Sequence, residues 1–426
     1  MAKVPEKILV VVMDSTVHSR VFDWSQSGQL PTLSNLIQNG VFCKNAFAFF
    51  PTVTAPNWAS LCTGTWPGVH GVTDQVIHLQ GEPLDMVHEP PNMDELPVET
   101  IWQAAERAGK RTIVMQPSFV VEATKGAALI KSAKQHLAQT VDHAKQEFST
   151  PWGFCFIHLD LLEKAQQAMS AAQFGESELA LHQAIDDALG ELIQAAGQGT
   201  LVVVTATHGF KEQGRAFQIA EILEKSGLLT YLPGKNKKID WSRTQVVPVG
   251  TSHLFVNLKG RDPEGIVETG QAYEQLVDKV ITVLLQYIDP DSGLGPVRVA
   301  LKRDDARVLG VWGDKAGDVV YAMDPRFGGA YGPYLTTARF KDGDLKGMLI
   351  MAGPGVKKGE IVDRPFWPMD IVPTLCYIAE MAEPRDSEGA VIYQALEEPS
   401  GQGMQIFGLK KELQRLKKIV DKPMMC

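Results

Sequence analysis

Short apolar runs rich in β-branched residues alternate with helical patterns along most of this chain. The runs are Ile8–Met13, Thr112–Met115, Gly153–His158, Leu201–Thr205 and Met348–Met351. They lack the apolar–polar alternation of a half-exposed strand, so we expect parallel strands buried on both faces. The helical patterns cover Leu30–Asn39, Glu99–Ala108, Ser132–Phe148, Glu176–Ala196 and Met369–Met381. This alternation predicts an α/β fold, a doubly wound sheet with helices on both faces.

The region from residue 210 to residue 322 has a different character. It contains short extended segments, such as Thr244–Val249, and a helical pattern at Glu274–Tyr287. We expect a smaller α+β cap here, inserted into a core formed by residues 1–209 and 323–426. A basic helical pattern at Gln405–Val420 lies near the end of the chain.

Composition narrows the class of protein. With 44% hydrophobic and 21% charged residues, the chain is typical of soluble globular proteins. Its net charge of −9 argues against general nucleic-acid binding, which needs a basic surface. The five cysteines are odd in number and scattered, which favours a reducing cytoplasm. No apolar run approaches the ~20 residues of a membrane helix, so we expect no membrane partner.

Polar residues follow the predicted strands, where doubly wound sheets bind their ligands. Asp14 follows the first strand, Asp160 follows the strand at 153–158, and Thr207 and His208 follow the strand at 201–205. Taken singly, each also fits a structural role, such as a helix cap. Because the carboxyl ends of parallel strands meet at one edge of a sheet, together they predict a site there.

A turn flanked by prolines, Phe50–Trp58, carries a further candidate. Thr54 lies in this turn, ahead of a predicted helix that begins near Asn57. A helix N-terminus there would offer backbone N–H groups to an anion. A threonine in such a turn also fits a purely local role.

Further motifs accompany this turn and the strand that ends at Asp14. They are Thr63–Gly71 (Thr-Gly-Thr-Trp-Pro-Gly-Val-His-Gly), Thr207-His208-Gly209, Asn257–Gly265, Gly353–Gly359 and Asp370–Leu375. Together they resemble the alkaline phosphatase superfamily, specifically its nucleotide pyrophosphatase and type I phosphodiesterase branch. The resemblance covers nearly the whole chain and implies an alkaline-phosphatase-like fold.

The resemblance also implies roles for individual residues. In this family two metal ions, usually zinc, lie about 4 Å apart and clamp the phosphoryl group. A threonine or serine attacks phosphorus and is transiently phosphorylated. By position, Thr54 would be the nucleophile and Asn57 the phosphate-binding amide. Asp14, His208 and Thr54 would hold the metal that activates the nucleophile, and Asp160 would bind the second metal.

Three positions depart from the family pattern. Thr207 stands where the family has an aspartate, Lys164 where it has a histidine after Asp160, and Tyr331 where it has a third histidine. A protonated lysine has no lone pair for zinc, and tyrosine is a poor zinc ligand at its usual pKa. We therefore expect the second metal to be lost, leaving either one divalent ion (zinc, magnesium or manganese) or no cofactor.

Two functional hypotheses follow, both with a small anionic substrate. In the first, the protein hydrolyses a phosphate mono- or diester, or a related anionic ester, through Thr54, and Lys164 replaces the lost cation electrostatically. In the second, the fold serves as a pseudoenzyme or a metal-independent enzyme, with Lys164, Tyr331 and His208 as acid–base or binding groups. Trp58 could stack on the substrate beside Tyr331, although core packing fits Trp58 equally well.

Overall fold

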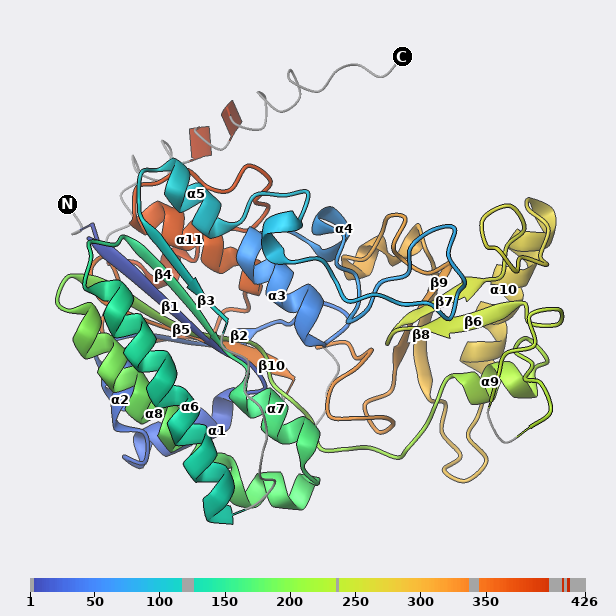
Figure 1. The fold of residues 1–426 in the computed structure, drawn as a ribbon, viewed down its shortest axis with the longest axis horizontal. Helices are drawn as coiled ribbons and strands as arrows, with labels where there is room; N and C mark the ends of the chain where they lie inside the picture. Colours follow the sequence, from blue (N-terminus) through green and yellow to red (C-terminus); the bar gives the residue numbers. More distant parts are fainter. Residues whose placement is uncertain are drawn as a thin grey trace.

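The computed structural model describes residues 4–116, 126–234, 237–336 and 345–397, together with residues 408, 409, 412 and 413. Most of the predicted helix at 405–420 lies outside the described residues. The four described residues within it, 408, 409, 412 and 413, are helical. A large sheet with helices on both sides occupies one half of the molecule, and a smaller sheet occupies the other (Figure 1). Within the described part of the chain, no helix combines the length and the apolar character needed to cross a membrane.

The large sheet has the strand order β11-β2-β10-β5-β1-β4-β3. Its strands are β1 (Lys7–Met13), β2 (Gly40–Ala46), β3 (Thr112–Met115), β4 (Phe154–Leu159), β5 (Thr200–His208), β10 (Lys346–Ala352) and β11 (Glu360–Val362). The prediction that Met348–Met351 is a parallel strand was wrong, since β10 runs antiparallel to both β2 and β5. The chain re-enters the sheet where Lys346 pairs with His208, at the carboxyl end of β5, and must run back from that edge.

Helices cover both faces of the large sheet, which confirms the predicted fold class. One face packs against α1 (His18–Gln26), α2 (Pro31–Gln38), α6 (Gly126–Phe148), α7 (Leu161–Ala168) and α8 (Ala171–Ala196). The other packs against α3 (Thr54–Thr63), α5 (Ile101–Arg107) and α11 (Ile371–Ile378). In β1, Leu9 and Val11 enter the first core while Ile8 and Val10 enter the second. Burial on both sides explains why this strand shows no alternation of polar residues.

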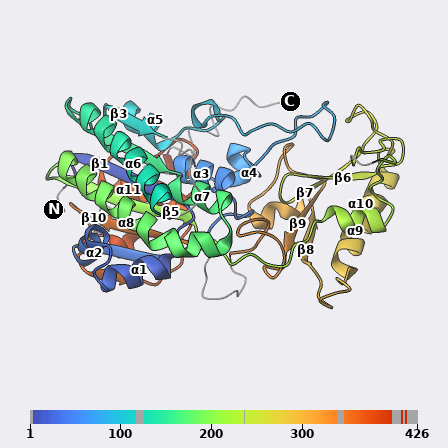
Figure 2. The same cartoon turned by 60° about the horizontal axis from the view of Figure 1, so that its bottom comes forward.

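The smaller sheet is antiparallel, in the order β6-β7-β9-β8. Its strands are β6 (Val246–Val249), β7 (His253–Val256), β8 (Val297–Lys302) and β9 (Val319–Met323), and they pack against α9 (Ala220–Lys225) and α10 (Gln271–Gln286). These elements lie together at one end of the molecule, away from α1 and α2 (Figure 2). The division of the chain at residues 210 and 322 stays a prediction.

The segment after the short helix α4 (Pro67–His70) links the two sheets. Leu84 packs against Val247 and Phe255 of the smaller sheet. The fully buried carboxylate of Asp74 accepts hydrogen bonds from the backbone N–H groups of Thr251 (2.9 Å) and Ser252 (2.8 Å). The contacts of Asp74 hold the chain immediately before Gln75, a residue of the candidate site.

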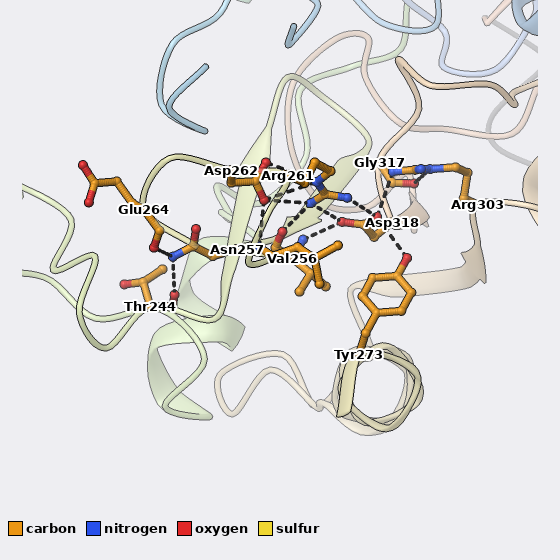
Figure 3. A network of polar contacts seen from close by, with 11 residues as sticks. Thr244, Val256, Asn257, Arg261, Asp262, Glu264, Tyr273, Arg303, Gly317 and Asp318 are labelled. Atoms are coloured by element: carbon orange, nitrogen blue, oxygen red, sulfur yellow. Dashed lines mark hydrogen bonds and ion pairs between the residues drawn. The ribbon is translucent and has the colours of Figure 1, made fainter. Parts of the chain in front are cut away.

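An ionic network holds the smaller sheet together around Arg261 (Figure 3). Its guanidinium donates to Asp318 at 2.7 and 2.9 Å and to Asp262 at 3.0 Å. Asp318 also accepts hydrogen bonds from Tyr273 at 3.0 Å and from Arg303 at 2.8 Å. Because Asp318 is 1% exposed and Asp262 is 6% exposed, both carboxylates depend on these partners.

Replacing Arg261 with alanine is expected to lower the free energy of unfolding by about 3–5 kcal/mol, because two buried carboxylates lose a shared counter-charge. Urea unfolding measures this loss. Arg298→Ala is the matched control, since that side chain is 55% exposed and its partner Asp324 keeps Arg326. The control is expected to cost less than about 1 kcal/mol. Equal losses in the two variants would contradict the assigned role of Arg261.

Candidate active site

The carboxyl edge of the large sheet collects the residues predicted to follow its strands. Met13 of β1 pairs with Leu159 of β4, so Asp14 and Asp160 leave the sheet side by side. The strand predicted at 201–205 continues to His208, so Thr207 and His208 are the last two residues of β5. β5 pairs with β1 on the side opposite β4. The expected convergence of these residues at one edge is what the structure shows.

Asn57 shapes the turn that presents Thr54 at the first position of α3. Its Nδ2 donates to the carbonyl oxygens of Phe49 (3.1 Å), Pro51 (3.1 Å) and Val53 (2.8 Å), and its Oδ1 accepts from the N–H of Phe49 (2.6 Å). The side chain is fully buried. These bonds give Asn57 a structural role, and binding phosphate, as the resemblance implied, would require breaking them.

The Thr54 hydroxyl lies between two acceptors. Oγ1 donates to Oε1 of Glu163 at 2.7 Å, and Nε2 of His208 lies 3.3 Å from the same oxygen. His208 Nδ1 is 2.9 Å from the carbonyl oxygen of Gly209. Because a carbonyl only accepts, this contact assigns the ring proton to Nδ1 and turns the Nε2 lone pair toward Thr54.

Glu163 comes from α7, in the turn of helix that follows Asp160. It is 7% exposed, and the Gln167 amide donates to its Oε1 at 3.0 Å. The sequence patterns pointed to the neighbouring Lys164, but successive helical side chains lie about 100° apart, so Lys164 points in a different direction from Glu163. The spacing of Asp160 and Glu163, three residues apart on one helical face, is the signal that could have found Glu163.

Asp14 is a fully buried carboxylate with a protein donor at each oxygen. Thr207 donates to Oδ1 from its N–H (2.8 Å) and its hydroxyl (2.7 Å), and Nε2 of His158 lies 3.2 Å from Oδ2. Burial alone would raise the pKa of Asp14. The His158 hydrogen bond, the charges of His208 and His158 and the Thr207 hydroxyl outweigh burial and lower the pKa to about 2. Asp14 is therefore ionised at neutral pH.

His158 and Trp58 form a stacked pair behind Asp14, with ring centroids 4.2 Å apart and planes at 24°. His158 shows no ligand spacing in the sequence. It is the next-to-last residue of β4 and so lies at the edge where Asp14 emerges. Trp58 is 6% exposed and also contacts Phe156. Its ring is thus part of the core that packs against the sheet.

Tyr331 lies beside His208 at this edge. Its ring is 5.8 Å from that of His208, at an angle of 60°. Burial and the nearby Glu163 carboxylate raise the pKa of Tyr331, so the phenol stays protonated at neutral pH and can donate a hydrogen bond. Ser15, next to Asp14, has a φ of 58°, a region that non-glycine residues seldom populate. Local strain of this kind is concentrated at functional sites.

Gln75 approaches the start of α3 from the segment that links the two sheets. Its Oε1 accepts a hydrogen bond from the N–H of Ala55 at 3.2 Å, one residue after Thr54. The side chain is exposed, so the site opens toward solvent on this side. The sequence patterns did not single out Gln75, since no local motif marks it.

The donor set at this edge can be compared with the metal centre that the resemblance implies. Both oxygens of Asp14 already have protein donors, and the Thr54 hydroxyl is turned to Glu163. Across the part of the chain that the structure describes, no three or more His, Cys, Asp or Glu side chains are grouped to hold a metal. Lys164 and the protonated Tyr331 supply no suitable lone pair. These residues do not fit a resident metal.

Comparison with known proteins identifies the family. The model of the type I phosphodiesterase / nucleotide pyrophosphatase family matches residues 8–344. The chain belongs to this family. Membership confirms the resemblance seen in the motifs and makes the protein a phosphoric ester hydrolase. No curated protein sequence matches the chain significantly.

Solved structures of alkaline-phosphatase-like proteins share the fold of this family member. Alkaline phosphatase PafA superposes with a TM-score of 0.69 at 13% identity, covering 93% of this chain and 100% of its own. Murine ectonucleotide pyrophosphatase / phosphodiesterase 5, in an inactive form in complex with AMP, gives 0.57 at 16% identity, covering 89% and 96%. At these identities the similarity supports the alkaline-phosphatase-like fold.

Proposed function

We propose that the protein hydrolyses phosphodiesters by covalent attack of Thr54 on phosphorus. The observation that carries this proposal is the Thr54 hydroxyl, which begins α3 and lies between Glu163 Oε1 and His208 Nε2. A hydroxyl becomes a useful nucleophile when a neighbouring group accepts its proton, and two acceptors are in reach here. Thr54 is only partly buried, so a substrate can approach it.

The start of α3 supplies the binding site for the phosphoryl oxygens. Backbone N–H groups in the first turn of a helix have no partner within the helix and attract anions. The Ala55 N–H contacts the exposed Gln75 side chain, which a phosphoryl oxygen can displace. Tyr331, a protonated phenol beside His208, is a second donor at the site.

The charges at the site favour a diester over a monoester. Asp14 is ionised, and Glu163 accepts hydrogen bonds from both Thr54 and Gln167, as a carboxylate does. Two unit charges about 5 Å apart at an effective dielectric constant of 20 interact by roughly 3 kcal/mol. A monoester dianion therefore meets more repulsion than a diester monoanion.

The proposed substrate carries a nucleotide, either as the leaving group or as the group that stays on phosphorus. The family description names nucleotide pyrophosphatases, and the murine relative is in complex with AMP. We therefore propose a nucleotide-containing phosphodiester as the substrate class, with a nucleoside monophosphate among the products.

Hydrolysis of matched aryl esters tests this function. We expect kcat/KM for bis(4-nitrophenyl) phosphate and for an aryl ester of a nucleoside monophosphate to exceed that for 4-nitrophenyl phosphate by at least about tenfold, since one extra carboxylate–phosphate repulsion is worth that much or more. Acid-quenched protein should carry the phosphoryl group on Thr54, located by peptide mass spectrometry. Faster turnover of the monoester, or an adduct on another residue, would contradict the proposal.

A further inference from the structure

We infer that Glu163 is the general base that removes the proton of Thr54, so that the nucleophile is activated by a carboxylate instead of a metal ion. The inference rests on the proposed role of Thr54 as nucleophile, and it adds a catalytic residue that the family pattern does not contain. It starts from the hydrogen bonds of a single hydroxyl.

The Thr54 hydroxyl has one proton and two neighbouring acceptors. The contact with Glu163 Oε1 is 2.7 Å, a normal length for a charge-assisted O–H···O bond, whereas the contact with His208 Nε2 is 3.3 Å. The proton therefore lies on the line to Glu163. His208 is fixed by Gly209 and holds the other side of Oγ1, which restricts the rotation of the hydroxyl.

The surroundings of Glu163 suit this role. The side chain is 7% exposed, so water competes little for its oxygens, and Gln167 holds Oε1 from the other side at 3.0 Å. A base within hydrogen-bond reach of the proton it removes meets the geometric condition for general base catalysis. The two oxygens of Asp14 accept from Thr207 and His158, whereas the Thr54 hydroxyl is directed to Glu163.

The reaction balances without a metal. In the first step the Thr54 Oγ1–P bond forms, the bond from phosphorus to the leaving oxygen breaks, the hydroxyl proton passes to Glu163, and solvent protonates the leaving alkoxide. In the second step water attacks phosphorus and the Oγ1–P bond breaks. Glu163 returns its proton to Thr54, and the proton lost by the attacking water goes to solvent. Glu163 ends as it began.

The test uses the full chain after dialysis against a chelator and measures two independent reactions. One is hydrolysis of the aryl diester, and the other is covalent labelling of Thr54 by a fluorophosphonate, followed by intact mass. In Glu163→Gln the amide oxygen can still accept from Thr54 but cannot take its proton. We expect both rates to fall by about 10²–10⁴-fold, with KM changed much less. Glu176→Gln, an exposed residue of α8, is the matched control.

A rescue experiment separates a base from a residue that only positions Thr54. In Glu163→Ala, added formate should restore labelling in proportion to its concentration, which a lost structural contact would not do. Unchanged rates in Glu163→Gln, or diester hydrolysis by the wild type that is lost on chelation and restored by zinc, would overturn the inference while leaving Thr54 as the nucleophile. An adduct on a residue other than Thr54 would instead overturn the proposed function, and with it this inference.

Discussion

Replacing Thr54 with alanine is expected to reduce phosphodiester hydrolysis by at least about 10³-fold, the scale seen when a nucleophile is removed from a covalent mechanism. The reason is that no other hydroxyl is held between Glu163 and His208 in the described part of the chain. The measurement is the steady-state rate with the best aryl diester. Alanine is well tolerated at the start of a helix interior, so the protein should keep its circular dichroism spectrum.

Two companion variants sharpen this result. Thr54→Ser keeps the hydroxyl and should retain most of the activity, together with the covalent adduct at residue 54. Thr282→Ala removes an exposed hydroxyl of α10, which bonds only to the Asp278 carbonyl in its own helix, and should leave the rate unchanged. If Thr54→Ala hydrolyses the diester within about tenfold of the wild type, water attacks phosphorus directly and Thr54 is not the nucleophile.

The positions of these strands could be predicted because a strand that is buried on both faces consists almost entirely of apolar residues. Lys7–Met13 has core on both sides, and its near-continuous apolar run is what a doubly covered strand requires. The direction of β10 could not be predicted in the same way, because an apolar run does not tell which end of the sheet the chain returns to. That depends on the chain between β5 and β10, which returns to the sheet beside His208.

Only those residues of the candidate site that lie at strand ends or in motifs could be predicted from the sequence. Asp14, His208 and Thr54 follow from their positions at one sheet edge, and the structure brings them together. Glu163 reaches the site by the direction of its side chain, and only its three-residue spacing from Asp160 could have indicated it. Gln75 reaches the site by a long loop, and no local motif marks it. For Asn57 the motif position suggested a phosphate-binding residue. In the structure its side chain makes four hydrogen bonds within the turn.

Stability is expected to fall steeply as the pH drops from 6.5 toward 4.5, because several histidines, His18, His70 and His182 among them, are buried in their neutral form. Burial lowers the pKa of His70 to about 3 and those of His18 and His182 to about 4, from an ordinary value of 6.5. Lys315 near His70, Lys346 and Lys44 near His18, and Arg20 near His182 add to the shift. The contacts of His70 show the cause, since its Nδ1 accepts from the Val72 N–H and has no room for a proton.

The sign follows from proton binding in the two states. Below pH 6.5 the unfolded chain protonates these histidines while the folded protein does not, so the unfolded state gains protons and unfolding becomes easier. Each histidine costs about 1.4 kcal/mol per pH unit, which gives roughly 8 kcal/mol for three histidines over two units. Since a typical domain has about 5–15 kcal/mol of stability, unfolding near pH 4.5 is expected. Protonation of Asp14 lowers the free energy of unfolding further only when the pH falls below 3.8, the ordinary pKa of an aspartate.

Urea unfolding at a series of pH values measures the effect. The wild type should lose about 4 kcal/mol per pH unit or more across this window, and His70→Gln should lose about 1.4 kcal/mol less per unit, because one proton fewer binds on unfolding. His143→Gln is the matched control, since His143 is exposed on α6 and should leave the slope unchanged. A flat profile between pH 6.5 and 4.5 would mean that the folded protein admits protons to these sites, which requires water to reach the core beside the strands.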